Sequence, residues 1–290
     1  MSLRWDADGF GHARGGGPDL AFRACGAGAP VVLLHGTSAS HAVWGPVADA
    51  LADEAFVVSL DQRGHGRSFK PRPAEGGPDS GYDGASFADD IVTVLDALGL
   101  PTAVLAGHSL GARNAWVAAA RHPSRVRAVV AVDYVPYVES AVLDALQTRV
   151  AGGDRVFEGL PEVEAYLQRR YPLMPADAVA RRARWGYSRR AEGGWVPLAP
   201  GWALDRVVEG FRTSWEEEFL RLAAPLVCLR GERSAVVSDD AWARARRARP
   251  DARWVDVAGA DHYVPEERPL LVAEEIRRVI RATADTASPG

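Results

Sequence analysis

The chain has 290 residues, of which 47% are hydrophobic and 25% charged, and its formal net charge is −4. These values fit a soluble globular protein of one large domain, or a core with an inserted subdomain, and argue against nucleic acid or a membrane as a partner. The two cysteines, Cys25 and Cys228, provide neither a disulfide framework nor a Cys/His metal site. The first residues contain no long apolar stretch, so we expect no signal peptide, no membrane span and a cytoplasmic location.

Short apolar runs bounded by turn residues recur along the chain. Runs of this length that are rich in β-branched residues are typical of parallel strands buried on both faces. They predict strands at residues 31–34, 56–60, 102–106, 126–132, 226–229 and 254–257. The segment before them, up to Ala24, predicts an antiparallel hairpin at one edge of the sheet.

Helical patterns fill most of the intervals between these runs. Apolar residues at helical spacing predict a helix at residues 87–98, with Ser86 as its N-cap and Gly99 beyond its end. Further helices are expected at residues 109–121 and 266–282. The alternation of strands and helices predicts an α/β fold with a mostly parallel, doubly wound sheet.

The alternation stops in the middle of the chain. Residues 137–215 show helical patterns and no strong strand, which predicts an inserted helical cap because a structureless loop of this length is unusual in a compact domain. The core then comprises residues 1–136 and 216–290. Residues 70–84 are expected to be a mobile surface loop, and residues 282–290 a disordered tail.

The pentapeptide Gly-His-Ser-Leu-Gly at residues 107–111 carries the strongest chemical signal. It follows an apolar strand and opens an alanine-rich helix, which is the context of a nucleophile elbow. Glycines at both ends permit the tight turn that lifts the Ser109 hydroxyl above the sheet. The backbone N–H of Leu110, at the helix N-terminus, is the first expected oxyanion donor.

An earlier strand ends in Leu34-His35-Gly36-Thr37. We expect the backbone N–H of Thr37 to be the second oxyanion donor, and His35 to brace this loop. The loop at residues 61–68 reads Asp-Gln-Arg-Gly-His-Gly-Arg-Ser, and structural hydrogen bonding is the preferred interpretation of its polar residues.

The candidate general base is His262. It follows the last predicted strand and precedes the last helix, so it can lie over the elbow. A neutral imidazole in that position can take the proton of the Ser109 hydroxyl and return it to the leaving group.

Together these motifs resemble the α/β-hydrolase superfamily over nearly the full length of the chain. The resemblance extends from His35-Gly36 through the loop at residues 61–68 and the elbow to Gly-Ala-Asp-His at residues 259–262. It implies hydrolysis at a serine. The expected nucleophile is a serine and not an aspartate, which argues against haloalkane dehalogenase or epoxide hydrolase chemistry.

The acid of the triad departs from the common family pattern. Most members place an aspartate after the seventh strand of the family sheet, where this chain has Ser234 and Ala235. An acid after the sixth strand is the known alternative, and Asp133 lies there. Asp133 is therefore the candidate that orients His262, with Glu232 or Asp239 as alternatives.

One subset of the family has a similar layout. The serine-to-acid-to-histidine spacing resembles that of amide hydrolases of vitamin B6 and nicotinate breakdown, such as (E)-2-(acetamidomethylene)succinate hydrolases and N-formylmaleamate deformylases. The resemblance implies cap arginines that bind a substrate carboxylate, for which Arg149 and Arg170 are the candidates. Residues 169–190 hold seven arginines and one acidic residue, Asp177, and a solvated helix face would also explain most of them.

The resulting hypothesis is a serine hydrolase that cleaves an amide-type bond in a small carboxylate, without a metal or an organic cofactor. An ester, lactone or carbon–carbon bond hydrolase with the same triad is the alternative. A non-catalytic receptor on the same fold is a third hypothesis, against which the intact serine and histidine argue. The expected partner is a small-molecule substrate, and a homodimer is possible.

Overall fold

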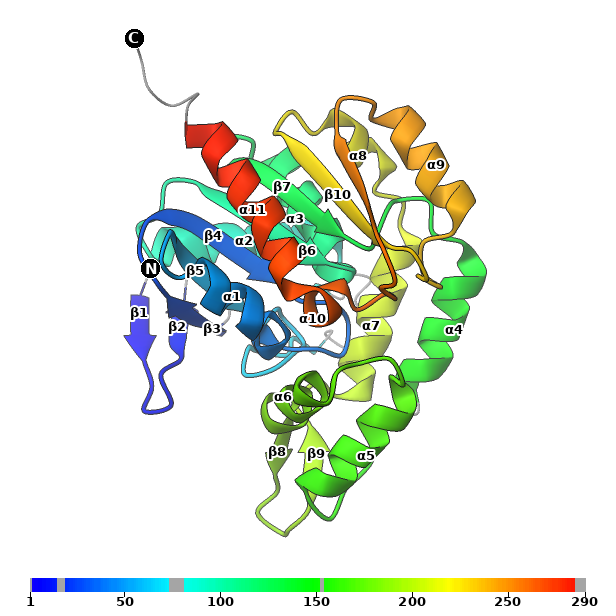
Figure 1. Ribbon diagram of the computed structural model, residues 1–290. Coiled ribbons are helices and arrows are strands. Elements are labelled where there is room, and N and C mark those ends of the chain that lie inside the picture. The colour runs from blue at the N-terminus through cyan, green and yellow to red at the C-terminus, as the bar shows by residue number, and fades with distance from the viewer. Residues whose placement is uncertain (1, 15–18, 73–80, 152–153, 285–290) are drawn as a thin grey trace.

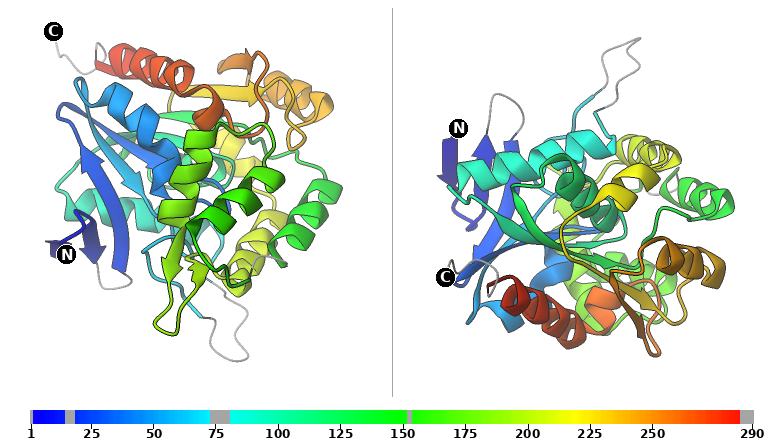
Figure 2. Two further views of the ribbon diagram at one scale, coloured as in Figure 1. Left: turned by 60° about the horizontal axis from the view of Figure 1, so that its bottom comes forward. Right: turned by 90° about the horizontal axis from the view of Figure 1, so that it is seen from above.

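The computed structural model describes residues 2–14, 19–72, 81–151 and 154–284. The elements form a twisted sheet with helices on both faces, and a group of helices covers one end of it (Figures 1 and 2). Residues 73–80 of the predicted mobile loop and residues 285–290 of the predicted disordered tail lie outside the described residues. Residues 282–284, also expected in the tail, instead belong to the last helix, whose helical pattern continues to Ala284.

The described residues form one large sheet in the strand order β1-β2-β3-β5-β4-β6-β7-β10-β11. Neighbouring strands pair in parallel from β5 to β11 in this order. The strands β1, β2 and β3 add an antiparallel edge next to β5. Both the parallel core and the antiparallel edge are therefore as predicted. The strands are β1 Ser2–Trp5, β2 Gly11–Arg14, β3 Asp19–Cys25, β4 Ala29–Leu34, β5 Ala55–Leu60, β6 Ala103–His108, β7 Val126–Val132, β10 Leu226–Gly231 and β11 Arg253–Val257.

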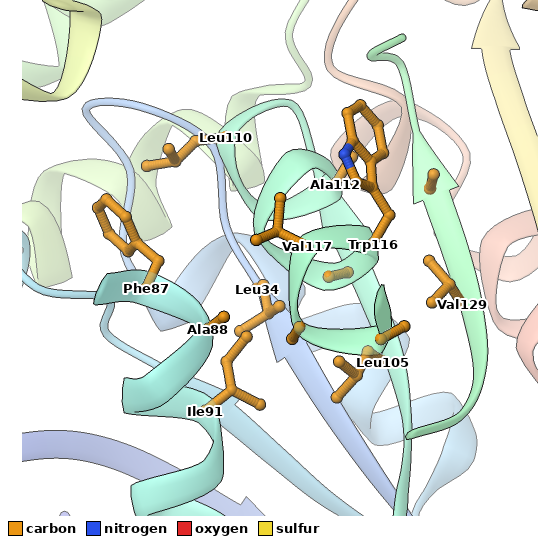
Figure 3. Packing of buried hydrophobic residues seen from close by; sticks show 14 of the residues in the cluster. Leu34, Phe87, Ala88, Ile91, Leu105, Leu110, Ala112, Trp116, Val117 and Val129 are labelled. Carbon is orange, nitrogen blue, oxygen red and sulfur yellow. The ribbon is translucent and has the colours of Figure 1, made fainter. Parts of the chain in front are cut away.

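Two apolar layers separate the sheet from its helices. One layer packs against α1 (Gly45–Leu51, preceded by the short helix η1, His41–Trp44), α10 (Val264–Glu267) and α11 (Pro269–Ala284). The other packs against α2 (Gly84–Ala97), α3 (Leu110–Arg121), α8 (Glu216–Arg221) and α9 (Asp239–Ala248). In this second layer, Leu34, Leu105 and Val129 of the sheet meet side chains of α2 and α3 (Figure 3). Continuous apolar strands need both layers, because neither face can remain in water.

A separate group of elements lies at the carboxyl ends of the parallel strands (Figure 1). It comprises α4 (Ser140–Ala151), α5 (Leu160–Arg170), α6 (Ala176–Gly186) and α7 (Gly201–Arg212), which we call the cap helices. The cap helices have small apolar clusters of their own, one of which centres on Phe157, Val163 and Leu167. Two short antiparallel strands, β8 (Tyr187–Arg189) and β9 (Trp195–Pro197), join α6 to α7. The sequence did not predict these strands, because three-residue segments show no periodicity.

Two local expectations were wrong. Asp83, not Ser86, is the N-cap of α2, since its carboxylate accepts the Ser86 N–H at 2.8 Å. A carboxylate one turn earlier outcompetes the serine for the free N–H groups of the first turn. The final helix is divided into α10 and α11, because Pro269 lacks the N–H that a continuous helix would use.

None of the helices in the described residues is both long enough and apolar enough to cross a lipid bilayer.

Candidate active site

Ser109 lies at a sharp bend between β6 and α3. Its backbone φ is +53°, a left-handed conformation that a serine rarely adopts. The flanking glycines explain how the bend is accommodated. A Cβ atom on Gly107 would lie 2.0 Å from the carbonyl oxygen of Gly111, and one on Gly111 would lie 2.1 Å from that of Leu34. No residue other than glycine fits at either position, so the backbone itself fixes the place of the Ser109 hydroxyl.

Asp133 and His262 meet at the ends of two other strands. Asp133 follows β7, is fully buried, and its Oδ2 lies 2.6 Å from Nδ1 of His262. The same carboxylate accepts the backbone N–H of Gly231 at 2.8 Å and the hydroxyl of Ser234 at 2.6 Å. A carboxylate can only accept, so Nδ1 of His262 carries a proton and Nε2 is left as the basic nitrogen. This is the tautomer that a general base requires.

The other two candidates for the acid lie elsewhere. Glu232 is exposed and accepts the backbone N–H of Gly259 at 2.7 Å. Asp239 is 94% exposed in its side chain and binds Arg230 at 2.7 Å. Among the three candidates, the structure brings only Asp133 to His262.

Ser234 is a residue whose role the sequence did not predict. It stands where most family members would have their acid, and its hydroxyl donates a hydrogen bond to Asp133. Its Oγ also accepts the backbone N–H groups of Val236 and Val237, each at 3.2 Å. The sequence did contain a signal for this role, because Ser234 occupies the position at which most family members have the acid of the triad. A serine there supports a carboxylate on the neighbouring strand instead of supplying one.

Ser109 and His262 line the same cavity at the carboxyl end of the sheet. In the described part of the chain they are not directly hydrogen-bonded, as is common in free hydrolases, in which this contact tightens when substrate binds. The carbonyl of His262 accepts a hydrogen bond from Nε2 of His108 at 2.8 Å. Burial holds the pKa of His108 well below its usual value of 6.5, so its ring remains neutral and serves as a fixed donor.

Thr37 and Leu110, the two expected oxyanion donors, lie on a loop of the Ser109 cavity and next to Ser109 in the chain, respectively. Thr37 lines the cavity, and Leu110 is the first residue of α3, where a helix leaves its N–H groups unpaired. Nδ1 of His35 donates to the Gly36 carbonyl at 2.8 Å, and its Nε2 accepts the Gln62 N–H at 3.0 Å. Burial lowers the pKa of His35 to about 4, which keeps this bridge neutral.

The loop at residues 61–68 forms hydrogen bonds to the segment at residues 35–41, which contains Thr37. His65 accepts the backbone N–H of Ser38 at 3.2 Å through Nε2, and burial lowers the pKa of His65 to about 3. Asp61 accepts the N–H and the Nδ1–H of His41 at 2.7 and 2.9 Å. These hydrogen bonds hold the segment at residues 35–41 in place, which is the structural role expected from the sequence.

Both predicted cap arginines line the cavity that contains Ser109. Arg170 donates to the Tyr171 and Tyr166 hydroxyls at 3.1 and 2.9 Å and to the Arg149 carbonyl at 3.2 Å. Within the described residues, neither Arg149 nor Arg170 forms an ion pair with a carboxylate. Both guanidinium groups are therefore able to bind an anion in the cavity.

A third cap arginine, Arg182, lines the same cavity, and the sequence did not distinguish it from its neighbours. Its charge is already neutralised, because Glu266 of α10 binds it through two nitrogens at 2.5 and 2.8 Å. The guanidinium also lies 5.1 Å from the ring centres of both Tyr171 and Tyr263. Arg182 therefore fastens a cap helix to the core beside His262.

Much of the remaining wall of the cavity is apolar and comes from α4, α7 and the loops that precede α4 and α9. About 60 Å³ is open to the centres of water molecules, which is room for a handful of waters and fits a small ligand. No group of His, Cys, Asp and Glu side chains suited to a metal ion occurs within the described ranges. The apolar lining residues are Val138, Val142, Leu143, Leu146, Phe211 and Val236.

Residues 29–269 match the model of the alpha/beta hydrolase fold family. The chain belongs to this family and is a serine hydrolase, which confirms the fold class and the family predicted from the sequence. It is 41% identical over 263 residues to the 2-(acetamidomethylene)succinate hydrolase of Mesorhizobium japonicum, covering 91% of this chain and 92% of the relative. The crystal structure of an E-2-(acetamidomethylene)succinate hydrolase superposes with a TM-score of 0.86, at 40% identity, over 91% of this chain and 96% of that one.

More distant relatives share less of the chain. A putative carbamate hydrolase of Caulobacter vibrioides is 34% identical over 175 residues, covering 60% of this chain and 59% of the relative. A marine microorganism esterase superposes with a TM-score of 0.74 at 22% identity, over 91% of this chain and 100% of that one, which shows the common fold alone.

Proposed function

We propose that this serine hydrolase cleaves an amide-type C–N bond in a small molecule that bears carboxylate groups. The observation that carries the proposal is the pair Arg149 and Arg170. They line the cavity of Ser109 and His262 and have no acidic partner among the described residues. A guanidinium without an acidic partner is the preferred protein group for a carboxylate. The similarity to the 2-(acetamidomethylene)succinate hydrolase of Mesorhizobium japonicum supports the same substrate class.

The reaction follows from the geometry in two halves. In the first, the Ser109 hydroxyl attacks the amide carbonyl carbon while Nε2 of His262 accepts the hydroxyl proton. The N–H groups of Thr37 and Leu110 stabilise the oxyanion. His262 then returns the proton to the nitrogen, the C–N bond breaks, and the acyl group remains esterified to Ser109. Asp133 stabilises the imidazolium that forms at each proton transfer.

The second half releases the acyl group. Water attacks the ester carbonyl as His262 accepts one of its protons, and the proton passes to the Ser109 oxygen as the ester bond breaks. The products are a carboxylic acid and the amine half of the substrate. The net reaction consumes one water molecule and needs no electron donor or acceptor, so residues of this chain suffice.

The test compares a carboxylate-bearing amide with an uncharged ester. We expect 2-(acetamidomethylene)succinate or a related N-acyl dicarboxylate to be hydrolysed with a higher kcat/KM than p-nitrophenyl acetate. Arg170→Gln should lower kcat/KM for the dicarboxylate about ten- to a hundredfold, because a charge-assisted hydrogen bond contributes about 1.5 to 3 kcal/mol. The ester should be hydrolysed by the variant as well as by the parent enzyme.

The matched control is Arg169→Gln, one position away on the same helix, where the arginine is exposed and does not line the cavity. It should leave both substrates unaffected. The substrate proposal is wrong if the ester is the better substrate, or if Arg170→Gln slows both substrates equally. An ester, lactone or carbon–carbon bond hydrolase would then be the better assignment.

We also propose a cytoplasmic enzyme whose partner is its small-molecule substrate, without nucleic acid or a membrane. The net charge of −4 supports this proposal, because it provides no electrostatic attraction to polyanions. Whether two chains form a homodimer is measured by sedimentation of the full chain.

A further inference from the structure

The five buried arginines of the described residues differ in whether they form an ion pair. Four of the five form ion pairs with carboxylates, as expected for charges removed from water. The four are Arg63, Arg182, Arg230 and Arg249. The fifth, Arg113 of α3, is the most deeply buried, with no exposed surface, and no ion pair is formed by it within the described residues.

The contacts of Arg113 leave much of its hydrogen-bonding capacity unused. Nε donates to the side-chain oxygen of Asn114 at 3.0 Å, and Nη1 donates to the carbonyl of Gly210 at 2.9 Å. Nη2 is buried and has no hydrogen-bond partner among the residues that the structure describes. The rings of Phe87 and Phe211 lie 5.4 and 4.7 Å from the guanidinium carbon, which offsets part of the cost of burying the charge.

The nearby charged groups do not neutralise this guanidinium. Asp83 is the acidic group that acts on it electrostatically, and its carboxylate is engaged in capping α2 through the N–H and hydroxyl of Ser86. Burial lowers the pKa of Arg113 to about 10, so the group is still charged at neutral pH.

Arg113 lines a cavity of about 190 Å³ between α3, the end of α7 and the chain that leads into α4. Buried residues form its inner part, among them Trp116, whose indole N–H is also buried and without a partner in the described part of the chain. Trp116 projects from α3 (Figure 3), and it follows Arg113 by three positions in the sequence of this helix. The exposed Ser140, Thr213 and Ser214 place hydroxyl groups at the outer part.

The charge of this cavity has one sign. Among the described residues, no carboxylate lines it, and the other cationic residue that does, Arg212, is bound to Asp144 at 2.8 Å. The two unpaired groups, the guanidinium of Arg113 and the indole of Trp116, are donors without any acceptor capacity. A small anion fits both groups, because it accepts hydrogen bonds from each and its negative charge balances that of the guanidinium.

We propose that this cavity is a second binding site, separate from the catalytic one, for a small carboxylate anion. The anion accepts hydrogen bonds from Arg113 and Trp116, and the hydroxyl groups at the outer part surround it. Tyr134, Val138, Leu143 and Phe211 line both this cavity and the catalytic one. The anion therefore lies on the far side of one wall of the catalytic cavity. That wall includes Tyr134, the residue that follows Asp133.

Titration calorimetry of the full chain with sodium acetate tests the proposal. The background is Arg149→Gln/Arg170→Gln, which removes the free arginines of the catalytic cavity. We expect one acetate to bind with Kd of about 1 mM, as for a ligand of few atoms. Arg113→Met should weaken binding at least tenfold. Trp116→Phe keeps the ring, removes the N–H, and should weaken binding about threefold to tenfold.

The matched control is Arg121→Met, on the same helix and exposed, which should bind acetate like the background. If Arg113→Met does not fold, the result with Trp116→Phe decides. The site is refuted if the background binds no acetate, or if Arg113→Met and Trp116→Phe both bind acetate as tightly as the background. Chloride and phosphate at the same ionic strength test the ligand class: weaker binding of both supports a carboxylate site, and equal or tighter binding of either contradicts it.

Discussion

The core and the cap contribute to the active site in different ways. In the core, the backbone fixes the reacting group: Gly107 and Gly111 leave no room for a Cβ atom, so the turn can hold Ser109 in one place only. In the cap, long side chains supply the chemistry, and Arg149 and Arg170 reach the cavity from two different helices. The comparison indicates that the core sets the type of reaction and the cap selects what reacts.

The largest expected effect belongs to the core. Ser109→Ala should reduce kcat by about 10⁴- to 10⁶-fold, because the nucleophile is lost while binding and the oxyanion donors remain. The melting temperature should stay close to that of the parent, since only one hydroxyl is removed. Steady-state kinetics and a thermal melt check both. Substantial remaining activity would mean that the elbow does not supply the nucleophile.

The second prediction compares two acids at the same end of the sheet. Asp133→Asn should reduce kcat by about 10⁴-fold, because an amide can no longer hold Nδ1 of His262 as the protonated nitrogen. Glu232→Gln, the matched control, should retain activity, since Glu232 binds the backbone N–H of Gly259 and not His262. Equal losses in the two variants would contradict the assignment of the acid.

The third prediction tests how the cap is fastened to the core. Glu266→Gln leaves the buried Arg182 without its counter-charge, and we expect the free energy of unfolding to fall by about 3 to 5 kcal/mol. The double variant Arg182→Met/Glu266→Met should recover most of this loss, because apolar groups of similar volume avoid the unpaired charge. Urea unfolding measures both variants. A double variant no more stable than the single one would show that the pair itself provides the stability.

The fourth prediction is a dependence of stability on pH that arises from the two buried rings of His35 and His65. The pKa of His35 is lowered from 6.5 to about 4 by burial, and that of His65 to about 3. The unfolded chain binds protons on both rings below pH 6.5, and the folded chain does not until lower pH, so protons favour unfolding in this window.

The free energy of unfolding should therefore be highest above pH 6.5 and decrease as the pH falls from 6.5 to about 4. Each ring contributes at most about 1.4 kcal/mol per pH unit. Urea unfolding across this range measures the slope, and His35→Gln should reduce it. A slope that is the same in both proteins would show that His35 is not the neutral bridge described.

Most of the core could be predicted from the sequence, because its signals are local. Buried parallel strands are continuous apolar runs, and β7 was predicted at residues 126–132 with the bounds that the structure gives. The elbow is a contiguous motif whose glycines have a steric cause. The error at Asp83 concerns a single hydrogen bond, which a pattern of apolar residues does not report.

The cap was less predictable, because its roles depend on pairs of residues far apart in the sequence. Arg170 and Arg182 lie in one arginine-rich stretch whose local pattern does not separate them, and the resemblance to the amide hydrolases alone pointed to Arg170. Glu266, 84 positions from Arg182, neutralises one of them and leaves the other available. The support that Ser234 gives to Asp133 spans 101 positions. Such contacts follow from the folded topology and not from local patterns.

The most direct test of the central claim is mass spectrometry of the intact chain after reaction with a fluorophosphonate, which labels activated serine hydroxyls. If Ser109 is the nucleophile, the chain takes one adduct, located on Ser109 by peptide mapping, and Ser109→Ala takes none. A folded protein that takes no label, or takes it on a different serine, would contradict the claim that residue 109 is the nucleophile.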